Sequence, residues 1–517
     1  MPSGEDGGGD RLGLGGGLGG TPLFRAWGVL FRATRAVGAR VREALASVRR
    51  GEHAFVVLVA IVIGGLGAAG AILFRSLILV THETFFASGE FTLGALSELP
   101  WWRRLLMPTL GGVVVGIIVT RFAPEVKGSG IPEVMEAVAR KGGVIRFRVI
   151  LSKAVAAAVT LGSGGSAGRE GPIIHIGSAI GSMVGQFLQV PPRMLRTFVA
   201  CGSAAAIAAT FNAPIAGALF AVEVVLGDLA VASLSPIVIS SVVATVISRH
   251  YLGDFPALRV PEYHLADPKE LLLYAGLGLV AGMVSVGFIR LLHGTSAAFE
   301  RSPIPPWLRP GVGGLAVGVI ALWLPHVYGV GYETIDSALW AQVGGLLLAV
   351  LVVAKMMATS LTLGSGGSGG VFAPSLFLGA ALGAAFGQVV HQLFPGWTAE
   401  PGAYALVGMG AVVAGTTHAP IAAILIIFEM TNDYLIIPPL MLTCVLAVLL
   451  SGRLNRNSIY TEKLARRGVR LFEGRDINLL GSIEVREVMD DSPRTIDAGL
   501  PFTEVLPLLL SGRHREL

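Results

Sequence analysis

A glycine-rich segment occurs twice in this chain, and each copy lies inside a long apolar tract. The first copy reads GSGGSAGREGP over residues 162–172, and the second reads GSGGSGGVFAP over residues 364–374. Further motifs recur in the same order and at nearly the same spacing: PxxGG from Pro108 and Pro310, PxxxGxG from Pro124 and Pro325, and APIA from Ala213 and Ala419. Collinear repeats of this kind indicate a duplicated unit. Duplicated apolar units broken by glycine and proline are typical of membrane transporters, whose site lies where the repeats meet.

The composition places the chain in a lipid bilayer. Of its 517 residues, 53% are hydrophobic and only 14% are charged, and the mean hydropathy is +0.70, which is too apolar for an ordinary soluble protein. Shorter apolar runs are interrupted by glycine and proline, which at membrane depth requires surroundings of protein or a water-filled cavity. We therefore expect a multi-pass protein with broken helices around an internal path. Stretches of membrane length recur at about residues 54–82, 104–121, 229–249, 270–293, 308–325, 341–363 and 434–451.

Positive charge gathers at both ends of the apolar region. Seven arginines lie within residues 25–50, and six Lys and Arg residues lie within 453–470. The positive-inside rule then predicts that both termini are cytoplasmic. Charges that flank membrane spans need no nucleic-acid partner, so none is expected. The two cysteines, Cys201 and Cys444, have neither disulfide nor metal-ligand spacing, and no metal or cofactor is predicted.

Composition also divides the chain into segments. Residues 1–50 hold a Gly-rich tail, expected to be disordered, and a basic amphipathic stretch that suits the membrane surface. No secretory signal is expected there, because no apolar core follows closely. The two repeats occupy residues 51–252 and 270–470, with a polar linker at 253–269, and the second ends in a charged helix that leads to the cytoplasm. Residues 471–517 turn soluble in character.

Three short segments place glycines before a proline that suits the first turn of a helix: GSGIP at 128–132, GREGP at 168–172 and GVFAP at 370–374. The first N–H groups of a helix have no partner within it, and they attract anions together with the positive end of the helix dipole. Three such starts at one point would hold a partly dehydrated anion weakly enough to release it. Each segment alone also fits a helix break whose glycines serve only close packing, but the duplication favours an anion site.

A nucleotide site is the competing interpretation of these glycines. The run GSGGSG at 364–369 fits the dinucleotide pattern GxGxxG, yet no β-strand precedes it and no βαβ unit surrounds it. Neither copy carries the Lys-Ser/Thr pair of a phosphate-binding loop. A nucleotide-dependent enzyme is therefore not expected, and no catalytic residues are predicted.

These three motifs, followed by SIYTEKL at 458–464, together resemble the CLC family of voltage-gated chloride channels and chloride–proton exchangers. The resemblance covers roughly residues 50–470 and keeps the motif order. It implies an all-α integral membrane fold of two inverted-topology repeats, built from broken and tilted helices. It also implies a homodimer with one chloride path in each subunit, and chloride as the ligand.

The resemblance assigns roles around the anion. Ser129 resembles the serine whose hydroxyl contacts chloride, and Tyr460 resembles the tyrosine that closes the inner side of the site. Val371 and Phe372 resemble the backbone N–H donors of the second repeat. The full set of expected chloride-binding residues is Ser129, Gly130, Ile131, Gly168, Arg169, Gly171, Val371, Phe372 and Tyr460.

Glu170 resembles the gating glutamate on the extracellular side. A carboxylate beside an anion site competes for the same donors, and it loses that affinity when it is protonated. The alternative is an Arg169–Glu170 ion pair at a loop. Lys153 and Lys355 precede the two Gly-rich loops at matching positions, and they are expected either to raise the potential of the path or to bind backbone carbonyls.

One position departs from the exchanger pattern. Exchangers of this family usually carry an inward glutamate that passes protons, and here Val224 occupies that position, next to Glu223. Because valine carries no proton, the sequence favours a passive channel. The alternatives are a proton-coupled chloride antiporter and a membrane scaffold without transport. Glu223 and its repeat, Glu429, are expected to form hydrogen bonds within the helix packing.

The last segment, residues 482–517, resembles the opening of a CBS domain, which is commonly appended to this family and often binds nucleotides. It stops before its strands would be complete. Nucleotide binding is therefore not supported by this segment.

Overall fold

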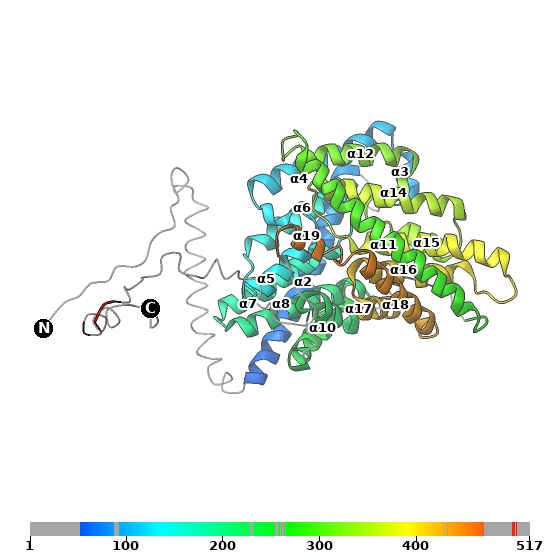
Figure 1. The fold of residues 1–517 in the computed structure, drawn as a ribbon. Coiled ribbons are helices and arrows are strands. Elements are labelled where there is room, and N and C mark those ends of the chain that lie inside the picture. Colours follow the sequence, from blue (N-terminus) through cyan, green and yellow to red (C-terminus); the bar gives the residue numbers. More distant parts are fainter. Residues whose placement is uncertain are drawn as a thin grey trace. The chain divides into compact units, whose positions relative to one another are not determined.

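The computed structural model describes residues 52–86, 92–227, 231–253, 258, 260, 263, 265–431, 433–469, 499–501 and 503. The tail predicted for residues 1–50 and most of the CBS-like segment predicted for 471–517 lie outside the described residues. Up to residue 469, the described ranges are helical and contain no sheet strand. The prediction of an all-α protein is therefore confirmed for this membrane unit (Figure 1).

Seven helices in the described part of the chain are long and apolar enough to cross a membrane. They are α2 (Glu52–Phe86), α4 (Trp101–Arg121), α8 (Pro192–Phe211), α11 (Glu270–Arg301), α14 (Gly345–Gly364), α15 (Phe372–Leu393) and α18 (Ile437–Leu454). Between them lie α3 (Leu93–Glu98), η2 (Pro124–Val126), α5 (Ile131–Arg140), α6 (Arg148–Gly162), α7 (Glu170–Phe187), α9 (Pro214–Phe220), η3 (Ala221–Leu226), α10 (Val231–Leu252), α12 (Arg309–Trp323), η4 (Pro325–Val327), α13 (Tyr332–Leu339), α16 (Pro401–Thr417) and α17 (Pro420–Thr431), and α19 (Thr461–Arg466) follows the last of them. The prediction of a multi-pass protein with interrupted helices is confirmed.

Small residues bring the central helices into backbone contact. The helix pairs α7–α8 and α15–α16 both pack closely, and their residues are mostly buried. A Cβ atom at Gly177 of α7 would lie 2.3 Å from the carbonyl oxygen of Gly202 on α8. A Cβ atom at Gly383 of α15 would likewise lie 2.0 Å from the carbonyl oxygen of Tyr404 on α16. Only glycine fits at such contacts, which explains part of the high glycine content.

The two repeats exchange matching contacts. Glu223, in the first repeat, accepts two backbone N–H groups from the first turn of α17, at 3.2 and 2.6 Å. Glu429, in the second repeat, accepts two from the first turn of α9, at 3.0 and 2.6 Å. Each carboxylate therefore caps the helix start of the other repeat, where the dipole favours negative charge. Reciprocal contacts are the mark of a two-fold relationship. The predicted packing role of both glutamates is confirmed.

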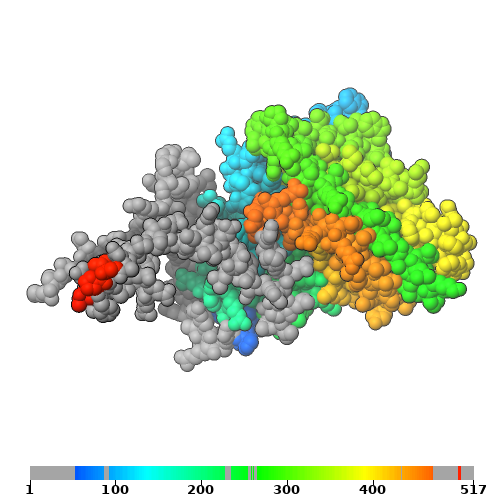
Figure 2. Space-filling view, viewed as in Figure 1, coloured from blue at the N-terminus to red at the C-terminus, as the bar shows by residue number. Residues whose placement is uncertain are grey.

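The end of the second repeat folds back over α11. Figure 2 shows α18 and α19 (orange) along α11 (green) on one face of the molecule. This return brings α19 to α5, which belongs to the first repeat. Residues that are far apart in the sequence, around Ser129 and Tyr460, are thereby carried by neighbouring elements.

Candidate functional site

The three predicted helix starts meet at one hydrogen-bonded junction. The N–H of Gly168 donates to the carbonyl oxygen of Gly370 at 2.8 Å, and the N–H of Gly370 donates back at 2.6 Å. The N–H of Gly128 donates to the carbonyl oxygen of Gly367 at 2.9 Å. The loops of both repeats are thus joined directly ahead of α5, α7 and α15.

Glycine at two positions makes this junction possible. Gly130 has φ of +88°, a left-handed conformation that favours glycine, and it turns the chain into α5. A Cβ atom at Gly171 would lie 2.8 Å from the carbonyl oxygen of Ser129 and 2.9 Å from the Cα of Gly370. The start of α7 therefore touches the backbone of both other loops.

The predicted chloride-binding residues lie within the protein around this junction. All nine are buried except Arg169, whose side chain is 26% exposed. Tyr460 belongs to the large apolar core that extends through both repeats, and it is 1% exposed. Its hydroxyl has no hydrogen-bond partner among the described residues. A buried donor without an acceptor costs free energy, which an anion at this place would recover.

Glu170 is buried with its carboxylate among the same helix starts. Its side chain is 1% exposed, and its Oε1 accepts a hydrogen bond from the Tyr332 hydroxyl at 3.1 Å. Arg169 Nε lies 3.8 Å from that oxygen. The other carboxylate oxygen, Oε2, is buried and has no hydrogen-bond partner among the described residues. The carboxylate thus lies beside the starts of α7 and α15 without a backbone hydrogen bond from the described residues, and the ion pair with Arg169 lies at a helix start.

Each repeat carries a fully buried lysine beside its first loop. Lys153 of α6 donates from Nζ to the carbonyl oxygens of Val126 and Gly128, at 2.9 and 2.5 Å. Lys355 of α14 binds the two matching carbonyls of the second repeat, at 3.0 and 2.8 Å. The carbonyl-binding interpretation is therefore confirmed. Both positive charges also lie next to loops that lead into helix starts, where they favour an anion.

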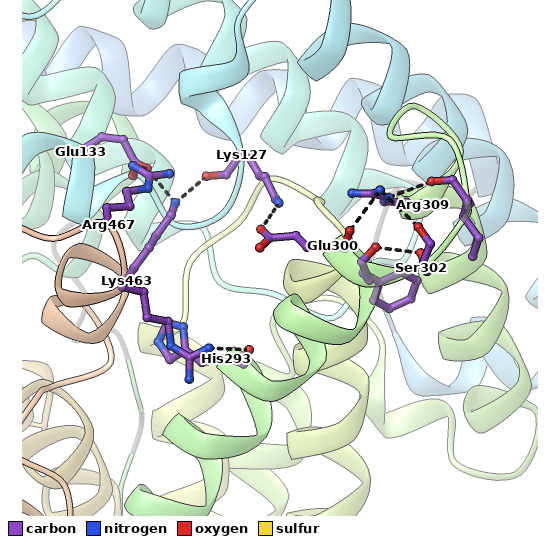
Figure 3. Close-up of polar contacts among 11 residues, drawn as sticks. Lys127, Glu133, His293, Glu300, Ser302, Arg309, Lys463 and Arg467 are labelled. Carbon is purple, nitrogen blue, oxygen red and sulfur yellow. Dashed lines mark hydrogen bonds and ion pairs between the residues drawn. The ribbon is translucent and has the colours of Figure 1, made fainter.

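A network of charged side chains ties α19 to α5 (Figure 3). Lys463 Nζ pairs with Glu133 Oε1 at 2.6 Å and donates to the carbonyl oxygen of Lys127 at 3.2 Å. Arg467 approaches the same Glu133 oxygen at 3.4 Å. Lys127 in turn pairs with Glu300 of α11 at 3.0 Å. Three elements are joined in this way.

The two predicted hydroxyl donors lie next to the elements that this network joins. Ser129 stands two residues before α5, and Tyr460 immediately precedes α19. The neighbouring Ile459 is held on both sides of its peptide unit. Its N–H donates to the carbonyl oxygen of Thr416 at 2.8 Å, and its carbonyl oxygen lies 3.1 Å from His293 Nε2. Tyr460 is therefore anchored through the backbone of its neighbour and the helix that follows, whereas its hydroxyl has no partner among the described residues.

The position of the expected proton glutamate is apolar. Val224 lies in η3, a π-helical continuation of α9, and its side chain is 6% exposed within the core. Its neighbour Glu223 is engaged in capping α17. A carboxylate is thus absent at Val224, and the nearest one in sequence has a structural role.

Sequence reasoning missed Tyr332, Glu133 and Lys463. Tyr332 follows Gly331 as Ile131 follows Gly130, so the duplication marks its position. The second repeat has no proline after it, however, and this hid the start of α13. The Glu133–Lys463 pair joins residues about 330 positions apart, which no local pattern reveals.

The family profile described as "Voltage gated chloride channel" matches residues 111–452. A protein of Ralstonia nicotianae described as "Putative chloride channel protein ClcB-like" is 38% identical over 408 residues, which cover 78% of this chain and 95% of the relative. "Voltage-gated ClC-type chloride channel ClcB" of Escherichia coli is 34% identical, over 79% of this chain and 98% of the relative.

Solved structures agree with these relatives. A slow cyanobacterial Cl⁻/H⁺ antiporter is 29% identical and superposes with a TM-score of 0.72 over 80% of this chain and 97% of its own. A eukaryotic CLC transporter, at 22% identity and a TM-score of 0.66 over 80% of this chain and 74% of its own, supports the fold alone. The fold prediction of two CLC-type inverted repeats is confirmed. This chain belongs to the CLC family of voltage-gated chloride channels and transporters.

Proposed function

We propose that this membrane protein, a CLC-family anion transporter, carries chloride past the junction of α5, α7 and α15, with Glu170 as the gate. The observation that carries the proposal is a carboxylate buried among three helix starts, each of which favours negative charge. Chloride is the anion because the curated relatives are described as chloride channels and because Ser129 occupies the family's serine position. The protein needs no cofactor and catalyses no covalent reaction.

Chloride binding then rests on dipoles and hydroxyl groups. The N–H groups that begin α5 and α15, at Ile131 and Phe372, donate to the anion, and Ser129 and Tyr460 add one hydroxyl each. The buried amino groups of Lys153 and Lys355 are engaged by carbonyl oxygens, and the Arg169 guanidinium lies beside Glu170. Binding is therefore strong enough to admit a partly dehydrated ion and weak enough to let it leave.

Gating follows from competition between two anions. The ionised Glu170 carboxylate takes the place and the donors that chloride needs. When the carboxyl group binds a proton it loses its charge, and with it most of its attraction to the helix starts. The neutral side chain then swings aside and the path opens. Lower pH should therefore increase chloride flux.

The transport mode that we propose is a passive channel. Val224 offers no site for a proton at the position where exchangers carry a glutamate, and Glu223 is engaged in a cap. The alternative is a proton-coupled antiporter, which the likeness to a structure described as a Cl⁻/H⁺ antiporter favours. A scaffold without transport is the least favoured alternative, because it gives the buried Glu170 no purpose.

Further features predicted from the family resemblance, the flanking charges and the last segment remain proposals. They are a homodimer with one path in each subunit, voltage-dependent opening, both termini in the cytoplasm, and a CBS-like segment after residue 470 to which we assign no nucleotide.

Chloride efflux from liposomes that contain the purified protein tests the proposal. Vesicles loaded with chloride should lose it through the wild-type protein, and faster at pH 5 than at pH 8. Vesicles without protein provide the background. Efflux equal to that background at every pH would contradict the chloride transport proposal.

A further inference from the structure

We propose that Tyr332 is the positioning residue that holds the Glu170 carboxylate over the helix starts and thereby sets the pH at which the path opens. This inference rests on the proposed gating role of Glu170. It adds a residue of the second repeat to a gate whose carboxylate belongs to the first. Both repeats would then contribute a side chain to the gate.

The hydrogen bond between the two side chains is the first observation. The Tyr332 hydroxyl donates to Glu170 Oε1 at 3.1 Å. Among the described residues, it is the one side-chain hydrogen bond to this carboxylate. A phenol that donates to an ionised carboxylate forms a charge-assisted bond, which is stronger than its neutral counterpart. Tyr332 therefore stabilises the ionised, closed form more than the protonated form.

The ring of Tyr332 supplies a second contact. The Arg169 guanidinium carbon lies 5.2 Å from the centre of this ring, within the range of a cation–π interaction. The same arginine approaches Glu170 Oε1 with its Nε at 3.8 Å. Tyr332 thus contacts both the carboxylate and the cation beside it. A substitution of Tyr332 to phenylalanine removes the hydroxyl and keeps the ring, so it tests the two contacts separately.

The loop before Tyr332 is built to hold the residue in place. Gly331 has φ of +89° and turns the chain into α13, whose first residue is Tyr332. Lys355 binds two carbonyl oxygens of this loop, at 3.0 and 2.8 Å. A Cβ atom at Gly331 would lie 2.6 Å from the Phe377 ring of α15. The hydroxyl is therefore presented by a packed loop.

Removing the Tyr332 hydroxyl leaves the other titratable groups around Glu170 in place, and Arg169 also loses its interaction with that hydroxyl. Tyr460, ahead of α19, and Arg169 couple to the carboxylate electrostatically. Arg75 of α2 interacts in turn with Arg169. Further along α7, His175 faces Lys153 of α6, together with Glu133 of α5 and Lys463 of α19. These groups set the background on which Tyr332 acts.

The test is a comparison of pH profiles of chloride efflux from liposomes. Tyr332→Phe removes the donor and keeps the ring over Arg169. The ionised carboxylate loses a charge-assisted bond, so the neutral form should predominate up to a higher pH. We expect the pH of half-maximal efflux to rise by about one unit, a roughly tenfold change in the protonation equilibrium.

Tyr328→Phe is the matched control. Tyr328 lies four residues earlier, and its hydroxyl donates to the carbonyl oxygen of Arg104 rather than to the gate. This variant loses the same phenol hydroxyl from the same loop. Its pH midpoint should equal that of the wild type.

The Glu170→Gln background separates this proposal from the gating proposal. If Glu170 is the gate, Glu170→Gln gives a flat profile, and adding Tyr332→Phe leaves that profile unchanged. A pH-dependent Glu170→Gln protein would refute the gating role itself. A flat Glu170→Gln profile together with a wild-type midpoint in Tyr332→Phe would overturn the role of Tyr332. A change of efflux caused by Tyr332→Phe in the Glu170→Gln background would also overturn it, because the hydroxyl would then act on the path directly.

Discussion

The two sides of the candidate chloride site are built on different chemistry. At the Glu170 side, a titratable carboxylate is held by side chains, namely the Tyr332 hydroxyl and the Arg169 guanidinium. At the Tyr460 side, the residue facing the site is a phenol whose hydroxyl has no partner among the described residues. Its position is fixed through the backbone of Ile459 and the helix that follows. The Glu170 side therefore carries a carboxyl group that can gain or lose a proton, whereas the Tyr460 side is fixed through backbone contacts.

The contacts of the two sides differ in whether they would have to break when chloride passes. If Glu170 is the gate, as we propose, each opening breaks its contacts with Tyr332 and Arg169. The Lys463–Glu133 pair lies between two helices and need not break when chloride passes. The first set should therefore control pH dependence, and the second should control stability and the geometry of the site.

The largest effect should come from Glu170→Gln. The amide has nearly the same shape as the carboxyl group but no charge, so it no longer competes with chloride. We expect efflux to lose most of its pH dependence and to stay near the low-pH rate of the wild type. The measurement is chloride efflux from liposomes between pH 4.5 and 8.5.

Glu333→Gln is the control for a lost carboxylate on the same side of the site. Glu333 follows Tyr332, is exposed, and accepts a hydrogen bond from the N–H of Leu93 at 2.6 Å. It should keep the wild-type profile. If instead Glu170→Gln retains that profile, the carboxylate is not the gate.

The hydroxyl donors should give the next largest effect. A hydrogen bond to a charged acceptor contributes about 1.5–3 kcal/mol, so removing one should weaken chloride binding by about tenfold to a hundredfold. Ser129→Ala and Tyr460→Phe each remove one donor without adding a charge. Calorimetric titration of each purified variant with chloride measures the loss. Unchanged affinity in both variants would place the site elsewhere.

Lys463→Met should act on stability more than on pH dependence. The variant leaves Glu133, whose side chain is 12% exposed, with Arg467 as its remaining partner at 3.4 Å. Because both members of the pair are partly exposed, we expect a loss of about 1–2 kcal/mol in the free energy of unfolding. Thermal unfolding in detergent, followed by tryptophan fluorescence, measures the change.

Arg466→Met removes the same charge from the same helix. Arg466 pairs with Glu462 within α19 at 2.9 Å, and these two side chains are more exposed than Lys463 and Glu133. Arg466→Met should therefore lower the free energy of unfolding by less than Lys463→Met does. Adding Glu133→Gln to Lys463→Met should recover part of the stability, since it removes the buried charge. Equal losses of unfolding free energy in Lys463→Met and Arg466→Met would show that the pair between α5 and α19 contributes no more to stability than the pair within α19.

The fold could be predicted from the sequence because its main signals are local. Apolar length marks the spans, and the Gly–Pro segments mark the helix starts at Ile131, Glu170 and Phe372. The duplication adds long-range information, because it shows that two distant loops such as 162–172 and 364–374 share one design. Their mutual hydrogen bonds then follow from placing both copies about a common axis.

The parts that were missed depend on contacts between distant elements. Tyr332 was hidden because the second repeat has Glu333 where the first has Pro132, so the helix start lacks its usual proline. The reciprocal caps of Glu223 and Glu429 were expected only as packing hydrogen bonds. Their partners could not be named, because a carboxylate pattern does not show which helix start it will meet.

The smallest expected effect concerns proton coupling, where we expect none in the wild type. With Val224 at the position of the proton glutamate, the described structure has no carboxylate there to relay a proton toward Glu170. An imposed chloride gradient in liposomes should therefore move no protons uphill, and the reversal potential should follow the chloride gradient alone. Stoichiometric proton movement would replace the channel proposal by the antiporter.

Val224→Glu asks the converse question with a single side chain. The new carboxylate would enter a core position that is 6% exposed, so it would be costly when charged and would bind a proton readily. We expect at most partial coupling, seen as a slow proton uptake that depends on the chloride gradient. Val222→Glu, two residues earlier and 2% exposed, controls for the general effect of a buried carboxylate in η3. Coupling in Val224→Glu but not in Val222→Glu would show that this one position separates the two modes of transport. Identical behaviour of the two variants would show that the coupling path requires more than a carboxylate at Val224.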